Sequence, residues 1–563
     1  MIRLALTLIL AALSSSPTAG SARRAPQDSR PPLNVLWLSV EDMSCWIGPY
    51  GDTTVPTPHL DAFARQAVRY DNAFADSPVC APARTALITG VYPTRMGAMH
   101  MRTRSHSKSL KGEPATPLYE AVPAPHVRCF PTRLRQAGYR TTNRSKTDYQ
   151  FKAPAWTWSE SSRKADYRDR PEETPFFAVI NHAGTHESRA FPEAKRMPEA
   201  VSVKDAPIPP IYPDTPGVRD ALARTYNNIA EMDRWFGAEL TKLEEAGLAD
   251  STVVFFFSDH GVGLPRGKRS LYGTGTRVPL LIRFPEGRAP EGLAPGTSTD
   301  RIVSFIDFGP TVLSLAGIEP DLRLDGRAFL GDHAAAPRSA AFFHADRFDG
   351  VYDRARAVTD GTRLVIRNLM PEVPHLIANA YRERIPMTHD LYALRDGADA
   401  AWSRTPAQWQ TGSSRRPAKE WYNRTGDPWE VRNLAASEAL DARETARFNA
   451  LEEQLDRWID DTGDLGLIEP EAQMVRTRLW SADGTQPVTQ RPELEETESG
   501  RWRIRCETEG ASFGYRRGQK GPWTPVDSDG TVVASESTDG APIEIRAHRI
   551  GYQPSEIVQV PAR

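Results

Sequence analysis

The chain has 563 residues, and its 70 basic side chains nearly balance 72 acidic ones, which leaves a formal net charge of −2. A charge so close to zero disfavours a surface that coats nucleic acid, so we expect no nucleic-acid partner, and any site for anions must be local. A chain of this length is expected to fold as more than one domain.

The first 20 residues have the pattern of a secretory signal peptide. Arg3 gives a positive start, an apolar run too short to span a bilayer follows, and small residues at 14–20 provide a cleavage region. No other segment is apolar enough to cross a membrane, so we expect a periplasmic or secreted protein without a membrane span. The four cysteines are too few for a disulfide framework in a chain this long.

Strands and helices alternate in the first half of the chain. Continuous apolar runs predict buried strands at 34–40, 175–181 and 251–261. Apolar residues at helical spacing predict helices at 57–70 and 218–246. Because polar residues follow the strands directly, the pattern predicts an α/β sandwich with its functional site along that edge of the sheet.

The pattern loosens after residue 290. We expect a strand and a helix within 301–318, a hairpin with an Asp-Gly turn at 354–368 and a helix at 436–461. Residues 371–435 predict no element, and 481–500 read as a linker.

The last part of the chain has short alternating strands between Gly and Asp turns, which predicts a small separate β-domain. The expected organisation is therefore a signal peptide at 1–20, a large α/β domain at 33–340, an α+β subdomain at 341–480 and a small β-sandwich at 490–563.

Two charged pairs follow predicted strands: Glu41-Asp42 and Asp259-His260. If their strands are parallel neighbours, the pairs lie together. Three carboxylates and an imidazole at one sheet edge suit a hard divalent cation, and Ca²⁺ is the ion that we expect. For either pair taken alone, capping of the turn after its strand is the better explanation.

A third feature is the segment "SPVCAPARTALITG", which places Cys80 where a short helix is expected to start. Its "CAPAR" fits the C-x-P-x-R signature of the type I sulfatases of the alkaline-phosphatase superfamily. The blocks "NVLWLSVEDM", "VVFFFSDHG" and "GKRSLYGTG" are also similar to blocks of that family, in the same order. The resemblance spans 33–460 and is greatest to sulfamidases, the heparan N-sulfatases, and their bacterial relatives.

The resemblance implies an alkaline-phosphatase-like sandwich with a largely parallel central sheet. It also implies hydrolysis of an O-sulfate ester or an N-sulfamate of a sulfated sugar, as in glycosaminoglycan or polysaccharide degradation. Two alternatives stay open: phosphonate or phosphodiester hydrolysis, which can use the same signature, and glycan binding without catalysis, which the retained motif residues disfavour.

The resemblance further implies that Cys80 is oxidised to formylglycine (3-oxoalanine) by a formylglycine-generating or an anaerobic sulfatase-maturating enzyme. One hydroxyl of the hydrated aldehyde would attack sulfur and expel the alcohol or amine. The other would then lose its proton and eject sulfate as the carbonyl re-forms. A thiolate could also attack, but its adduct would lack this route of release. A buried structural cysteine is the simpler alternative.

By the same resemblance, Glu41, Asp42, Asp259 and His260 match the metal ligands, and the formylglycine at Cys80 would complete the shell. Glu41 stands where Asp is commoner, and His260 stands where Asn is commoner, so direct ligation is least secure for Glu41.

The remaining matches concern the sulfate. Arg84 corresponds to the arginine that stabilises the hydrated formylglycine, and Lys146 and Lys268 correspond to lysines that contact sulfate. His186 matches the later histidine of an H-x-x-H pattern, so we expect it to contact sulfate and act as general acid. His182 is expected to be a structural or substrate-side residue.

Two features set this chain apart. Asp148 stands where the family commonly has the histidine of Lys-x-His, and a carboxylate cannot be a cationic sulfate contact, so we expect it to accept a hydrogen bond from substrate or to orient Lys146. The segment 504–526 resembles the small β-sandwich that ends chitobiase-like hexosaminidases, which fits either a carbohydrate-binding accessory or a packing module.

Overall fold

The computed structural model describes residues 31–105, 116–144, 146–396, 415–435, 437, 440–498, 501–528, 530–533 and 542–560. The expected signal peptide at 1–20 lies outside these residues. Leu33–Arg563 form one compact unit. Within the described ranges, no helix has the length and apolarity that a membrane span requires.

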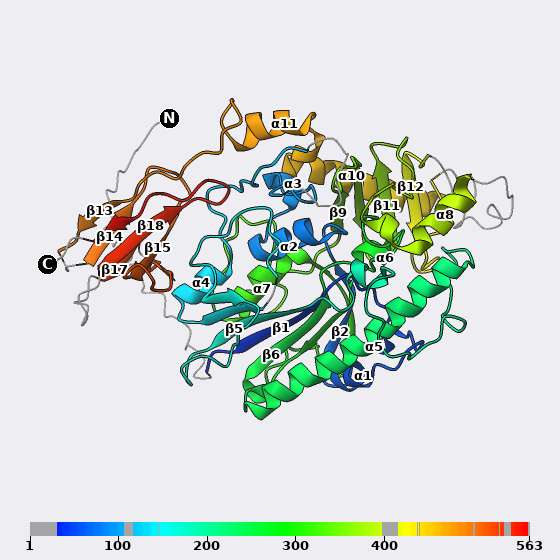
Figure 1. Ribbon diagram of the computed structural model, residues 1–563, viewed down its shortest axis with the longest axis horizontal. Coiled ribbons are helices and arrows are strands. Elements are labelled where there is room, and N and C mark those ends of the chain that lie inside the picture. Colours follow the sequence, from blue (N-terminus) through cyan, green and yellow to red (C-terminus); the bar gives the residue numbers. More distant parts are fainter. Residues whose placement is uncertain are drawn as a thin grey trace, which may run out of the picture. The chain divides into compact units, whose positions relative to one another are not determined.

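An eight-stranded sheet lies at the centre of the α/β part (Figure 1), with the order β4-β3-β5-β1-β6-β7-β2-β8. Its strands are β1 (Asn34–Val40), β2 (Val68–Phe74), β3 (Arg140–Arg144), β4 (Glu160–Ser162), β5 (Phe176–His182), β6 (Thr252–Ser258), β7 (Leu280–Arg283) and β8 (Ser298–Ser304). Only β7 runs antiparallel to its two neighbours. The expectation of a largely parallel central sheet is confirmed.

Helices cover both faces of this sheet (Figure 1). One face carries α1 (Pro58–Ala64) and α5 (Pro216–Glu245), and the other carries α2 (Cys80–Thr89), α4 (Pro131–Gln136) and α7 (Phe308–Leu315). Strand β1 shows why both faces are covered, because successive side chains of a strand point to opposite faces of the sheet. Leu36 and Leu38 join the core beneath α5, whereas Val35 and Trp37 join the core beneath α2.

The expected strands at 34–40, 175–181 and 251–261 are confirmed as β1, β5 and β6, and α5 confirms the helix at 218–246. The helix expected at 57–70 is wrong in its second half, because α1 ends at Ala64 and β2 begins at Val68. The parallel pairing of β2 with β8 fixes this segment as a strand, and nothing local in the sequence reports that pairing.

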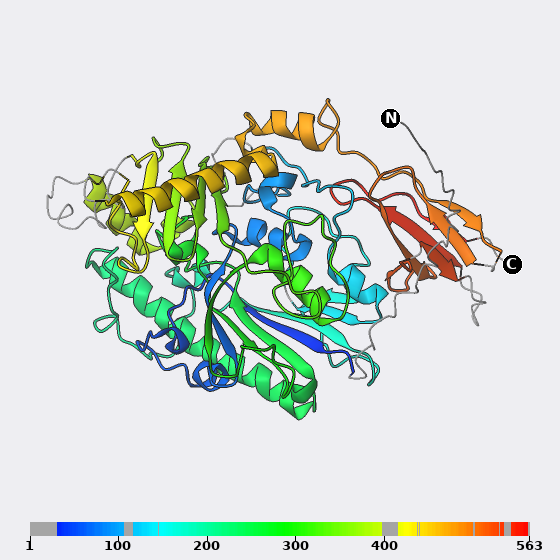
Figure 2. The same cartoon turned by 180° about the vertical axis from the view of Figure 1, so that it is seen from behind.

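A second, antiparallel sheet has the order β12-β11-β10-β9. It contains β9 (Ala341–Ala345), β10 (Ala355–Thr359), β11 (Arg363–Asn368) and β12 (Lys419–Asn423), and α10 (Ala442–Thr462) lies across it (Figure 2). The hairpin at 354–368 is confirmed, with Gly361 at φ 88° in its turn. The helix expected from 436 begins only at Ala442, because the Asp441 carboxylate caps it by accepting the Glu444 N–H.

Two elements of this region were not expected. Helix α8 (Pro386–Asp396) and strand β12 fall in 371–435, where the sequence predicted none.

The shorter helices of the chain are α3 (Pro93–Met96), α6 (Gly273–Thr276) and α11 (Glu471–Met474). The unit expected at 301–318 is confirmed as β8 and α7.

Two small antiparallel sheets end the chain, with the orders β13-β14-β17 and β16-β15-β18-β19. Their strands are β13 (Glu493–Glu496), β14 (Arg501–Arg505), β15 (Ser512–Arg517), β16 (Thr524–Pro525), β17 (Thr531–Val533), β18 (Ile543–His548) and β19 (Val558–Gln559). Trp502 and Ile504 of one sheet share a core with Ile543 and Ile545 of the other, as in a sandwich. The linker expected at 481–500 is wrong in its second half, because β13 lies there and pairs with β14.

Candidate active site

Two charged pairs leave the central sheet side by side. Strands β1 and β6 are parallel neighbours with Val40 opposite Ser258, so Glu41-Asp42 and Asp259-His260 follow at the same edge. The backbone N–H of Asp42 donates to Oδ1 of Asp259 at 3.1 Å. The expectation that neighbouring strands bring the pairs together is confirmed.

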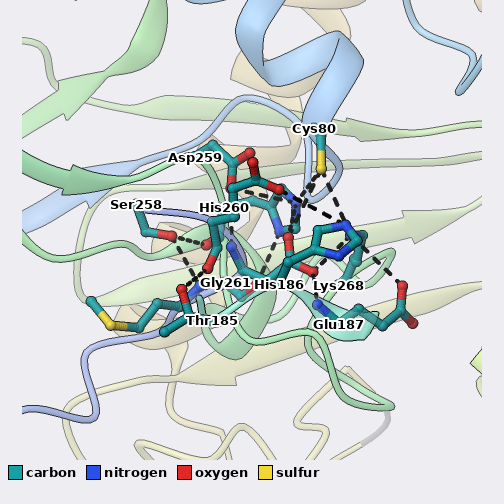
Figure 3. Close-up of polar contacts among 12 residues, drawn as sticks. Cys80, Thr185, His186, Glu187, Ser258, Asp259, His260, Gly261 and Lys268 are labelled. Carbon is teal, nitrogen blue, oxygen red and sulfur yellow. Dashed lines mark hydrogen bonds and ion pairs between the residues drawn. The ribbon is translucent and has the colours of Figure 1, made fainter. Parts of the chain in front are cut away.

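Cys80 is the first residue of α2, which begins over this edge (Figure 3). Its Sγ lies 3.2 Å from Nε2 of His260, 3.7 Å from Nζ of Lys268 and 3.9 Å from Oδ1 of Asp42. The side chain is 1% exposed. The thiol is therefore enclosed by charged groups from two strand ends and one loop.

The surrounding charges determine the ionisation of this thiol. Burial would raise the pKa of Cys80, but the ammonium groups of Lys146 and Lys268 outweigh burial and lower it to about 6. At neutral pH the unmodified residue is therefore a thiolate, the reactive form of cysteine.

Each buried carboxylate of the site has a cationic partner. Nζ of Lys268 lies 2.7 Å from Oδ2 of Asp42, and Nε of Arg84 donates to Oδ2 of Asp259 at 3.1 Å. Burial opposes ionisation of Asp259, but His260 and Arg84 hold the pKa of its carboxyl at about 2. The pKa of Asp42 lies well below its usual value despite burial, because Lys268 and the two nearby histidines favour the anion. Both carboxylates are therefore charged at neutral pH.

These groups form a donor set that fits a divalent cation. Asp42, Cys80, Asp259 and His260 each offer a ligand atom, all within 4.8 Å of one another, and all four residues are buried. Two ionised carboxylates suit a hard ion such as Ca²⁺. Burial would lower the pKa of His260, but Asp259 and Asp42 raise it to about 10, so His260 must release a proton before it can ligate.

Glu41 belongs to a second, overlapping group with Asp42, Cys80 and His186. Its Oε2 lies 2.8 Å from Nζ of Lys146 and 3.9 Å from Nε2 of His186. The structure thus pairs Glu41 with Lys146 and places it outside the group formed by Asp259 and His260.

The two candidate histidines lie in different surroundings. His186 precedes a short 3-10 helix (Glu187–Ala190), and its Nδ1 lies 2.9 Å from Oγ of Ser188. His182 ends β5 and stacks on Trp235, with ring centroids 4.4 Å apart. Burial and Arg189 lower the pKa of His182 to about 4. The structure therefore brings His186, and not His182, into the group around Cys80.

Partial exposure identifies the side chains at the opening of the site. The side chains of His186, Lys146 and Asp148 are 18%, 21% and 28% exposed, whereas those of Asp42 and Asp259 are fully buried. Oδ2 of Asp148 lies 3.8 Å from Nζ of Lys146. These three polar side chains therefore border the solvent-facing side of the site.

Glu187 and Arg269 are site residues that the sequence analysis missed. The Arg269 guanidinium donates to both carboxylate oxygens of Glu187, at 2.8 and 3.0 Å, and both residues are buried. Oε2 of Glu187 also lies 3.7 Å from Nζ of Lys268, and its backbone N–H donates to Oδ2 of Asp42 at 2.8 Å. Their one signal in the sequence is adjacency to His186 and Lys268.

Comparison with known proteins agrees with this geometry. The sulfatase family model matches residues 33–318. An ulvan-active sulfatase of Formosa agariphila is 39% identical over 561 residues, which covers 94% of this chain and 91% of that protein. Human N-sulphoglucosamine sulphohydrolase is 27% identical over 498 residues, which covers 78% of this chain and 92% of the human protein.

Solved structures share the fold at low sequence identity. A protein in complex with its substrate, D-glucosamine-2-N,6-O-disulfate, aligns with a TM-score of 0.52 at 16% identity, over 78% of this chain and 99% of its own. A protein from Bacteroides fragilis aligns with a TM-score of 0.53 at 18% identity, over 80% and 99%.

Proposed function

Because this chain belongs to the sulfatase family, we propose that it is an exported enzyme that releases sulfate from a sulfated saccharide by means of a formylglycine formed at Cys80. The observation that carries the proposal is the position of Cys80. It begins a helix and faces Lys268, His260 and Asp42 within 3.9 Å, where a nucleophile would meet both cations and metal ligands.

The side chains around Cys80 would serve two purposes, which are to bind a metal ion and to support the nucleophile. Asp42, Asp259 and His260 would hold a Ca²⁺, which would supply positive charge for the sulfate oxygens and for the ionised nucleophile. A hydrated formylglycine would supply the attacking hydroxyl. Arg84 lies within 3.1 Å of Asp259 and keeps a second cation beside the nucleophile.

The cationic and proton-bearing residues around Cys80 would act on the substrate. The partly exposed Lys146 and the buried Lys268 both bring positive charge to Cys80 and would hold sulfate oxygens. His186 has its pKa raised, because the nearby Asp42 outweighs its burial, so it would hold a proton to donate to the leaving oxygen or nitrogen. Asp148 would accept a hydrogen bond from the sugar.

The relatives suggest two substrate classes. The Formosa agariphila relative acts on ulvan and aligns along nearly its whole length, so ulvan oligosaccharides are the first substrates that we propose. The alignment with the human relative covers nearly the full length of that protein, which acts on N-sulphoglucosamine. A sulfamate is therefore the second candidate substrate. We also propose the domain boundaries expected from the sequence: one at 340, between the α/β domain and the α+β subdomain, and one at 480–490, before the small β-sandwich.

The test uses full-length protein co-produced with a formylglycine-generating enzyme. Mass spectrometry of the tryptic peptide 70–84 should show the Cys80 sulfur replaced by an aldehyde oxygen, and N-terminal sequencing of exported protein should show the leader removed. Ion chromatography should detect sulfate released from ulvan oligosaccharides or N-sulphoglucosamine, at rates above those of hydrolysis of a phosphonate monoester and a phosphodiester.

Cys80→Ala should abolish this release and leave thermal unfolding nearly unchanged, because the loss is chemical. Cys129→Ala is the matched control, since Cys129 is also buried but packs in the apolar core away from the charged groups. Full sulfate release by protein with an intact Cys80 thiol would overturn the mechanism. Faster hydrolysis of the phosphorus esters would overturn the substrate class.

A further inference from the structure

The ammonium group of Lys268 lies between three groups of the site. Its Nζ is 2.7 Å from Oδ2 of Asp42, 3.7 Å from Sγ of Cys80 and 3.7 Å from Oε2 of Glu187. Cys80 and Asp42 have proposed tasks as the nucleophile and a metal ligand, whereas Glu187 has none. What this buried carboxylate does for Lys268 is therefore the question that the geometry raises.

Two guanidinium groups fix the carboxylate of Glu187. Arg269 donates to both of its oxygens, at 2.8 and 3.0 Å, and Nε of Arg382 lies 3.6 Å from its Oε1. The side chains of Glu187, Arg382 and Arg269 are 0%, 1% and 4% exposed. A pair with two parallel bonds has one preferred geometry, so the carboxylate cannot turn away from Lys268 without breaking both bonds.

The same cations also fix the backbone around Lys268. Nη2 of Arg382 donates to the backbone oxygen of Lys268, and the backbone N–H of Arg269 donates to that of Pro78, just before α2, at 2.8 Å. Arg269 has φ 73°, a left-handed conformation that costs free energy for a residue with a side chain and persists only where its surroundings hold it. The pair with Glu187 is one of the contacts that hold it.

Arg382 reaches Lys268 from a distant part of the chain. It begins the 3-10 helix Arg382–Arg384, just before α8, in the segment 371–435 for which the sequence predicted no element. Its backbone N–H donates to Oδ1 of Asn379 at 3.2 Å, and its backbone oxygen accepts from Oγ1 of Thr388 at 3.1 Å. The guanidinium therefore extends from a backbone that is itself held in place.

We propose that Glu187 and Arg382 are positioning residues that keep the ammonium group of Lys268 beside Cys80. A divalent cation bound to Asp42 would take up much of the charge of that carboxylate and would repel the ammonium group. Glu187 supplies negative charge on the other side, and Arg382 holds the backbone from which Lys268 extends. The inference rests on the proposed function in one point, which is that Lys268 holds a sulfate oxygen.

The first test is a crystal structure of the full-length Glu187→Gln variant, which keeps the shape of the side chain and removes its charge. Nζ of Lys268 should move at least about 1 Å away from the side chain at position 80, a displacement large enough to matter for catalysis. An unchanged position of Lys268 would overturn the proposal, whether or not the protein releases sulfate.

Glu471→Gln is the matched control for this structure. Glu471 is buried and accepts two bonds from Arg347, at 2.7 and 2.9 Å, as Glu187 does from Arg269. It belongs to neither group of ligand atoms around Cys80. Lys268 should therefore keep its position in Glu471→Gln, and an equal shift in this variant would also overturn the proposal.

The second test measures sulfate release from a saccharide in a double-mutant cycle. Glu187→Gln should lower kcat/KM at least about tenfold when Lys268 is present. It should lower kcat/KM by less than about twofold once Lys268→Ala has removed the ammonium group, because a positioning residue acts through the residue that it positions. A carboxylate that only stabilises the fold would cause the same loss in both backgrounds, and that result would overturn the proposal.

The two tests separate this inference from the proposed function. If the protein releases no sulfate, the proposed function fails, and the crystal structures still decide whether Glu187 positions Lys268. Should Glu187→Gln fail to fold, Arg382→Met takes its place in both tests. That variant removes the bond to the backbone of Lys268 and leaves Glu187 paired with Arg269.

Discussion

Nε2 of His260 lies 3.2 Å from Sγ of Cys80, although 180 positions separate the two residues in the chain. The contact exists because β6 ends beside β1 at the edge over which α2 begins. His260 thereby touches both the proposed nucleophile and the proposed metal ligands, since its Nε2 also lies 3.1 Å from Oδ1 of Asp42.

The first prediction concerns metal binding through His260. His260→Asn should keep bound Ca²⁺ and part of the activity, because an amide oxygen is a ligand that Ca²⁺ accepts. His260→Leu removes the donor and should weaken metal affinity at least about tenfold, a loss that elemental analysis after dialysis would detect. His389→Leu, at an exposed position of α8, is the control. Full metal content in His260→Leu would show that His260 is not a ligand.

The second prediction concerns the choice of substrate by Asp148. This residue is partly exposed at the opening and has φ 52°, a left-handed conformation that Asn and His tolerate better than most side chains do. Asp148→Asn should therefore fold normally and change the relative kcat/KM among sulfated saccharides more than the chemistry that they share. Asp148→His should broaden activity toward a simple aryl sulfate.

A panel of mono- and disulfated saccharides with one aryl sulfate tests the role of Asp148. A uniform fall of kcat/KM across that panel would mean that Asp148 only holds Lys146, whose Nζ lies 3.8 Å away.

The third prediction concerns pH and the buried Asp76. Burial raises the pKa of its carboxyl to about 7, with a further contribution from Asp307. In the unfolded chain the pKa is near 4, so between these values the folded state holds a proton that the unfolded state releases. Asp76 should therefore contribute stability at low pH that is lost as pH rises from 4 to 7, by roughly 4 kcal/mol in total.

Asp76→Asn cannot titrate and should flatten this part of the dependence of Tm on pH. Thermal unfolding from pH 4 to pH 8 is the measurement, with the exposed Asp300→Asn as control. An unchanged pH profile in Asp76→Asn would contradict the prediction.

The fourth prediction concerns the buried ion pairs of Arg356. Its Nη2 lies 2.9 Å from Oδ1 of Asp346 and donates to Oδ1 of Asp464 at 3.0 Å, and all three side chains are at most 1% exposed. Arg356→Met leaves two buried carboxylates without their cation and should cost about 3–5 kcal/mol of unfolding free energy. Urea unfolding is the measurement.

Arg367→Met is the control for Arg356, because Arg367 pairs with Asp456 at the surface, where the two side chains are 27% and 57% exposed. It should cost about 0–1 kcal/mol. Equal losses in the two variants would show that burial of the pair is not what matters.

The sequence alone determined the features that depend on neighbouring residues. Buried strands β1, β5 and β6 appear as continuous apolar runs, because both faces of a central strand must exclude water. The charged pairs after β1 and β6, and the motif at Cys80, are short enough to be seen without any contact between distant parts of the chain.

Only the tertiary structure decided which groups meet. The residues at 68–70 continue a helical pattern locally, but pairing of β2 with β8 makes them a strand. His182 and His186 are four positions apart, and packing sends one to Trp235 and the other toward Cys80. The pair Glu187–Arg269 joins residues that are distant in sequence. Such contacts are set by sheet register and packing between elements, which periodicity within one element cannot encode.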